Sequence, residues 1–296
     1  MIRWLLLLAF GLVLAACASQ TDTRPLAEQQ AERLLERGVA AYQQGDALTA
    51  SHHFKRALAK YQGFDQRSGQ LQAHLNLAAS LLQLGRLEAA REQALIAIQL
   101  ARVLDEPEYY QQALWLQARW AWLAGEVDLS RDYLDGLLNA EQSLAPAVEL
   151  SALALRAHLA LHLADDSSWL ERFEERLAGQ QAAAHQLQLR RLQAWQQGLE
   201  GDFTAAVQEL EAVLAVYREQ AQRPGLAATL TELGHLHQRQ GELEAAEDLF
   251  KRALRVRLHM QDRHHSRQLL LDLAAVYRTQ GQEQLALAAE QQAENL

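Results

Sequence analysis

Glycine recurs in this chain at a spacing that few folds can accommodate. Two sets of three glycines have members 40 residues apart: Gly45, Gly85 and Gly125, then Gly201, Gly241 and Gly281. A glycine or alanine stands seven positions before each of them, and an alanine or serine stands five positions after it. The position nine residues after is usually bulky, as at Phe54 and Phe250. Self-similarity at a period of this length indicates a repeat protein.

The pattern predicts one helical hairpin in each period. The chain is rich in Ala, Leu, Gln, Glu and Arg and has four prolines, which favours helices throughout. A glycine ends a helix readily because it adopts a positive φ without steric cost. Small residues on both sides of the turn let the two helices approach closely, with a bulky side chain between them. Since one hairpin cannot bury its own apolar face, neighbouring hairpins must stack.

One period lacks its glycine. The position 40 residues after Gly125 is Asp165, and the next glycine of the pattern, Gly201, follows 36 residues later. Taking Ala164 as the turn recovers a small residue before it, Ala157, and a bulky one after it, Phe173. This makes a degenerate fourth repeat and predicts seven repeats in all, at about 31–64, 71–104, 111–144, 150–183, 187–220, 227–260 and 267–296.

Two segments carry a family resemblance. The stretches "GVAAYQQGDALTASHHFKRALA" and "ELGHLHQRQGELEAAEDLFKRALR" resemble tetratricopeptide (TPR) repeats. The 40-residue period exceeds the common 34 of that family and is closer to the longer variant of kinesin light chains and bacterial peptide-sensing regulators. The resemblance covers about residues 29–296. It implies an all-α solenoid of about seven hairpins, a right-handed superhelix whose first helices line a concave groove.

The start of the chain predicts a membrane anchor. "MIRWLLLLAFGLVLAAC" has a basic start and an apolar run too short to span a bilayer comfortably, which is typical of a signal peptide over residues 1–16. Leu14–Cys17 resembles the lipobox of bacterial lipoproteins, which implies cleavage before Cys17 and lipidation of this sole cysteine. Residues 17–28 read as a tether, and residues 29–296 as the solenoid. Because no aspartate follows Cys17, the resemblance favours the outer membrane, facing the periplasm. The sequence by itself does not distinguish the inner from the outer membrane.

Three of the six tryptophans fall within eight residues. Trp115, Arg119 and Trp122 share one face of the third repeat's first helix, and the resemblance implies that this face lines the groove. Trp120 is expected in the core. The fifth repeat places Arg191 and Trp195 at equivalent groove positions, and Asn76 matches an asparagine that contacts bound peptide in the longer-period family. The alternative is that the long repeats need large fillers, which would leave these indoles buried.

Other functions are disfavoured by what the sequence contains. A net charge of −9 argues against nucleic acid and anionic lipid surfaces as partners. No catalytic or phosphate-binding motif occurs, so no enzyme and no cofactor are expected. Two histidine groups could hold a metal by their positions in the sequence: His158 and His162 with Asp165 and Asp166, and His259, His264 and His265 with Asp262. Such pairs are more often solvated helix-surface residues, and no metal site is expected.

The sequence therefore predicts a membrane-anchored scaffold or adaptor of the cell envelope. Its concave groove would bind a peptide segment or a partner helix through the aromatic and guanidinium side chains above. The alternative is a sensing module that captures a short peptide or a cell-wall fragment. Neither the partner nor the oligomeric state follows from the sequence.

Overall fold

Seven stacked helical hairpins form the part of the chain that the structure describes. The structure is a computed structural model, and it describes residues 25–140, 143–166 and 168–296. The signal segment 1–16 and Cys17 lie outside the described residues. The hairpins, numbered one to seven, pair these helices: α2 (Leu26–Gln43) with α3 (Ala47–Gly63), α4 (Arg67–Gln83) with α5 (Leu87–Leu104), α6 (Pro107–Leu123) with α7 (Val127–Leu138), α8 (Pro146–Leu163) with α9 (Ser168–Leu177), α10 (Ala183–Glu200) with α11 (Phe203–Glu219), α12 (Arg223–Gln240) with α13 (Leu243–His259), and α14 (Arg263–Thr279) with α15 (Glu283–Glu294).

The turns within hairpins follow the glycine pattern. All six glycines of the 40-residue pattern have a positive φ, and Ala164 takes the left-handed conformation, φ 51°, in hairpin four. The expected degenerate turn is therefore confirmed. Each first helix begins about one turn earlier than the predicted repeat. Helix α2 begins at Leu26, inside the segment assigned to the tether, because Pro25 and the residues after it allow the helix to start there.

Small and large residues interlock as the pattern predicts. A Cβ placed on Gly38 would overlap the ring of Phe54, and a Cβ on Gly234 would lie 2.5 Å from the ring of Phe250. Ala157 and Phe173 in hairpin four are fully buried. The bulky side chain therefore occupies the place that a larger residue would need on the first helix.

First helices form the inner layer of the solenoid. Consecutive first helices contact one another from α2 through α4, α6, α8 and α10 to α12, while each second helix packs on its own first helix and on the next hairpin. The apolar core runs between these layers in several buried clusters. Within the residues that the structure describes, no helix combines the length and apolarity that crossing a bilayer requires.

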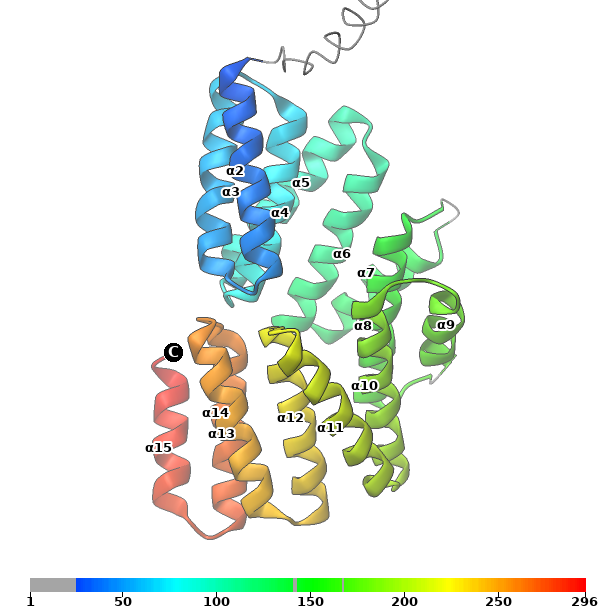
Figure 1. The fold of residues 1–296 in the computed structure, drawn as a ribbon, viewed down its shortest axis with the longest axis vertical. Coiled ribbons are helices and arrows are strands. Elements are labelled where there is room, and N and C mark those ends of the chain that lie inside the picture. The colour runs from blue at the N-terminus through cyan, green and yellow to red at the C-terminus, as the bar shows by residue number, and fades with distance from the viewer. Residues whose placement is uncertain (1–24, 141–142, 167) are drawn as a thin grey trace, which may run out of the picture.

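The solenoid returns upon itself. The upper ends of α12 and α14 lie beneath the turns of hairpins one and two (Figure 1). A Cβ on Gly45 would lie 3.6 Å from the ring of Pro224, and a Cβ on Gly85 would lie 2.6 Å from the backbone nitrogen of His264. We call this contact between hairpins one and two and hairpins six and seven the seam. It closes the stack around its inner layer of helices.

Candidate binding surface on the inner face

The predicted groove residues of α6 lie on the inner layer and are half-buried. Trp115, Arg119 and Trp122 are each partly exposed, whereas Trp120 is 5 % exposed and belongs to the core as expected. Arg119 stacks on Trp115, with its guanidinium carbon 5.0 Å from the ring centroid. Trp115 and Trp122 also pack against buried side chains. These two indoles are thus partly buried and partly exposed, and the groove role expected for them stays a prediction.

Trp122 is surrounded by the histidines of hairpin four. Its ring lies 5.5 Å from His158 and 5.3 Å from His162, edge to face in both cases, and the two imidazoles stack at 5.7 Å. Burial lowers the pKa of His158 to about 3, with help from the nearby charges of His162, Arg191 and His265. These histidines were expected on a solvated helix surface. His158 instead lies half-buried on the inner face, because its helix turns it toward α6, whereas His162 is exposed.

Arg191 is on the inner face but already has an acidic partner. Its Nε donates to Glu232 Oε2 at 2.9 Å, and a second nitrogen donates to the other carboxylate oxygen. The two side chains are 14 % and 13 % exposed. Burial opposes the charge of Arg191, but the carboxylate of Glu232 outweighs it and raises the pKa of the guanidinium. This bidentate ion pair joins hairpins five and six. It leaves fewer N–H donors of Arg191 available to a ligand than the sequence suggested.

Trp195 begins a chain of contacts toward the last hairpin. It lies 6.3 Å from the ring of His235, which packs on Phe250 at 4.9 Å. His235 Nε2 is 3.7 Å from Asp272 Oδ2, an ion-pair distance without a hydrogen bond. Burial raises the pKa of Asp272, and the positive charge of His235 opposes that rise.

Asp262 organises the entry to α14. Its carboxylate accepts from the backbone nitrogen of His265 at 3.2 Å, as an N-cap, and contacts the His265 ring at 2.8 Å. It also accepts from Arg257 at 3.0 Å. This carboxylate is therefore committed to a cap and an ion pair, and His259, which was grouped with it, is exposed.

The candidate metal ligands Asp165 and Asp166 of hairpin four also have other interaction partners. Asp165 pairs with Arg156 at 3.3 Å, and Asp166 accepts from the backbone of Ser168 at 3.0 Å. Over the described ranges of the chain, no group of three or more His, Cys, Asp or Glu side chains has the arrangement of a metal site.

Asn76 lies half-buried on α4, and its amide is used within its own helix. The side-chain nitrogen donates to the carbonyl of Gln72 at 2.9 Å. The groove role that the resemblance implied for Asn76 stays a prediction.

Residues far apart in sequence act on one another across the inner face. The charge of Arg119 contributes to lowering the pKa of His265, after burial and Arg257. The charge of Arg191 acts on both His158 and Arg257. Hairpins three to seven thus bring basic side chains to one region, because the closed stack faces its first helices toward a common centre. We call the side chains gathered there the inner cluster, and they are Trp115, Arg119, Trp122, His158, His162, Arg191, Trp195, Glu232, His235, Arg257, Asp262, His265 and Asp272.

Sequence reasoning missed several members of the inner cluster, although a signal for them existed. Arg119, Trp195 and His235 each stand six residues before the turn glycine of their hairpin. His158 stands six before Ala164. One register of the repeat therefore supplies an inner-face side chain in four successive hairpins, and reading it through all repeats would have found His158 and His235.

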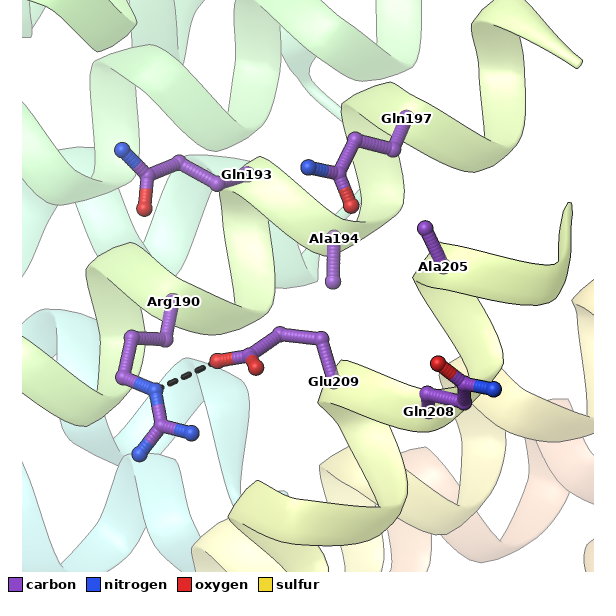
Figure 2. Close-up of a pocket in the computed structure, with 7 residues that line it drawn as sticks. All are labelled: Arg190, Gln193, Ala194, Gln197, Ala205, Gln208 and Glu209. Atoms are coloured by element: carbon purple, nitrogen blue, oxygen red, sulfur yellow. Dashed lines mark hydrogen bonds and ion pairs between the residues drawn. The ribbon is translucent and has the colours of Figure 1, made fainter. Parts of the chain in front are cut away.

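A shallow depression of about 340 Å³ lies on another stripe of α10, between α10 and α11 (Figure 2). Its charged residues, Arg190 and Glu209, are paired with each other, and the remaining lining is glutamine and alanine. Since the acid and the base neutralise one another, this depression presents no free charge. Arg191 and Trp195 do not line it.

Comparisons with known proteins agree with this architecture. The tetratricopeptide repeat model matches residues 198–259, and no curated protein sequence matches the chain. Three similar solved structures are Rap proteins. The Rap conjugation regulator of plasmid pLS20, solved in complex with the Phr* peptide, has a TM-score of 0.68 at 17% identity over 81% of this chain. The present chain spans 65% of that protein's length.

The other two Rap structures are somewhat less similar. RapI in its apo form has a TM-score of 0.62 at 11% identity and covers 80% of this chain and 85% of its own. A Rap protein complexed with Competence and Sporulation Factor has a TM-score of 0.62 at 14% identity and covers 90% of this chain and 76% of its own. At these identities the likeness is one of fold: an α-solenoid of TPR-type hairpins.

Proposed function

We propose that this TPR-type solenoid is a binding scaffold that receives an extended peptide or a partner's helix on its inner face. The observation that carries the proposal is the inner cluster, in which aromatic and basic side chains from five hairpins face one region and, apart from the buried Arg257, keep part of their surface exposed. Tryptophan and arginine bury large areas yet keep a polar handle, and they dominate the binding energy of many interfaces. The scaffold needs no chemistry of its own for this role.

The similar Rap structures support a peptide as one kind of occupant. Two of them were solved as complexes, one with the Phr* peptide and the other with Competence and Sporulation Factor. A short peptide held in the same place would make the protein a sensing module, and a segment of a larger protein would make it an adaptor. The adaptor is the primary proposal because the partly exposed cluster extends over hairpins three to seven, a span that suits a long segment.

The proposed setting is the cell envelope. Lipidation of Cys17 would hold the solenoid close to a membrane, which we propose is the outer membrane on its periplasmic face, where partners would be envelope proteins. The sequence of residues 1–17 supports this proposal. Mass spectrometry of the mature amino terminus tests it, with Cys17→Ser as the control: a mature terminus that begins elsewhere, without an acyl mass, would exclude the anchor.

Site-specific photocrosslinking tests the binding surface. A photoreactive amino acid is placed in cells at inner position 122 and at Thr231, which stands ten residues before its turn glycine as Trp115 and Arg191 do. It is also placed at two exposed positions of second helices, 95 and 258. Discrete adducts at the inner positions, absent at the outer ones, are the expected result. Adducts confined to positions 95 and 258 would move the function to the outer surface and end the proposal. Adducts lost on adding an excess of a short envelope peptide fraction would favour the sensing module.

A further inference from the structure

The negative charges of the inner cluster are already committed. Glu232 is taken by Arg191, and Asp262 is shared by Arg257 and His265. Asp272 faces His235. Among the described residues, Asp272 Oδ2 is the oxygen of these carboxylates that is buried without a hydrogen bond; it lies 3.7 Å from His235, and no ion pair joins it to Arg119.

Arg119 is the guanidinium that remains. Throughout the part of the chain that the structure describes, it makes no hydrogen bond or ion pair, and its contact is the face of Trp115 at 5.0 Å. Stacking fixes the planar group while leaving its N–H donors on the rim of the ring available to an acceptor. The indole Nε1 of Trp115 is also buried without a hydrogen-bond partner. The site is rich in donors and poor in acceptors.

In the described chain, Arg119 lacks the acidic partner that Arg191 and Arg257 have. Its charge lowers the pKa of His265, and Arg257 acts on the same ring. The Nε of Arg257 is buried and has no partner in the described chain. The three arginines of the inner cluster are matched in number by Glu232, Asp262 and Asp272, and burial disfavours the charged forms of His158 and His265, so the positive charge left without a partner is that of Arg119. An anionic group placed there would gain charge-assisted hydrogen bonds from the guanidinium of Arg119.

We propose that Arg119, stacked on Trp115, is a subsite for a carboxylate group of the bound chain. This inference rests on the proposed function, because it names the chemistry that the inner face selects. The carboxylate has two possible sources, an aspartate or glutamate side chain within the segment or a free carboxyl terminus. A glutamine or amide in its place offers a neutral acceptor and forms weaker bonds with the guanidinium.

Three octapeptide probes separate these sources. The first is blocked at both ends and contains two central glutamates, the second has glutamine at both positions, and the third has the glutamine sequence with a free carboxyl terminus. Each is titrated into ¹⁵N-labelled protein while the Nε–H signals of Arg119 and of the tryptophan indoles are followed by NMR. We expect one acidic probe to bind at least tenfold more tightly than the blocked glutamine probe and to shift the Arg119 signal.

Arg119→Met preserves the apolar stem on Trp115 and removes the charge. It should reduce the affinity for the acidic probe to that for the glutamine probe, without changing the latter. The matched control is Arg91→Met, which removes an arginine stacked at 4.3 Å on Trp120 at the exposed surface of α5. It should change neither affinity.

Other outcomes would overturn the inference and are distinguishable from failure of the proposed function. Equal binding of the acidic and blocked glutamine probes would retain an inner-face peptide site and exclude a carboxylate subsite. Binding that prefers the acidic probe but is unaffected by Arg119→Met would place the carboxylate elsewhere. Absence of binding by all probes at millimolar concentration would also reject the subsite, while the crosslinking at positions 122 and 231 would decide the proposed function separately.

Discussion

Gly85 and Gly125 occupy the same turn in successive hairpins, yet their surroundings differ. Both are left-handed, with φ of 68° and 81°. A Cβ on Gly85 would lie 2.6 Å from the backbone of His264, whereas a Cβ on Gly125 would meet no atom within 4 Å. Glycine is needed at position 125 for its backbone conformation, and at position 85 also for the close approach of another part of the chain. Equivalent residues of a repeat thus carry different constraints once the stack closes.

The largest expected effect is from Gly85→Ala. The left-handed conformation costs an alanine about 1 to 2 kcal/mol, and the overlap with the backbone of His264 adds about 1 to 3 kcal/mol. Urea unfolding followed by tryptophan fluorescence should show a loss of unfolding free energy from both the backbone conformation and the overlap for Gly85→Ala. Gly125→Ala should show the loss from the backbone conformation alone. Small-angle scattering should show an increased radius of gyration for the Gly85 variant, because the seam must separate. Equal behaviour of the two variants would mean that the seam does not form in solution.

The protonation of His264 provides a second probe of the seam. Burial lowers its pKa to about 4. Because the folded-state pKa lies below the ordinary value of about 6.5, the folded state disfavours the proton, and stability is lost as the pH falls from about 6.5 toward 4. We expect Gly85→Ala to expose His264 and raise its pKa toward 6.5, measured by NMR titration, while Gly125→Ala leaves it near 4. An unchanged pKa in the first variant would show that the imidazole is buried by something other than the seam. The charged groups that also act on this ring are His265, Asp262, Arg257 and Arg267.

Gly45→Ala tests whether an ordinary packing distance at the seam costs less than the steric overlap at Gly85. A Cβ on Gly45 would lie 3.6 Å from Pro224, an ordinary packing distance. The variant should therefore lose about 1 to 2 kcal/mol of unfolding free energy, the backbone cost alone, as in Gly125→Ala. A loss as large as that of Gly85→Ala in the same urea experiment would indicate a tighter seam at hairpin one than the structure has.

The smallest expected effect is a gain at the turn that lacks glycine. Ala164 adopts φ 51° at the end of α8. Replacing it by glycine relieves left-handed strain of about 1 to 2 kcal/mol and costs about 0.5 to 1 kcal/mol in chain entropy. We expect Ala164→Gly to stabilise the protein by about 0.5 kcal/mol, seen as a small rise in the urea midpoint. A fall in the midpoint would mean that the methyl group of Ala164 packs favourably.

Local features of the fold were readable from the sequence because they depend on residues close together in the chain. The glycine turns, the pairing of Gly38 with Phe54 and the degenerate turn at Ala164 all follow from spacings within one hairpin. The burial of Trp120 followed from its register on the helix. These features require no knowledge of how successive hairpins rotate.

The seam and the inner cluster could not be read in the same way. Whether Gly85 meets His264 depends on small rotations summed over several hairpins, and no pair of residues specifies that sum. Arg191 was correctly placed on an inner helix, but its partner Glu232 belongs to the following hairpin, 41 residues away. The resemblance therefore indicated which helices face inward, whereas the contacts among their side chains required the structure.

The close approach at Gly85 also limits how this protein can change length. An open repeat array can gain or lose a unit at little cost, because each unit contacts its neighbours alone. Here hairpins three to six separate Gly85 from His264, and one hairpin more or fewer would bring a different surface to that turn. The seam thus makes the number of repeats a fixed property of the fold, as closure does for a barrel.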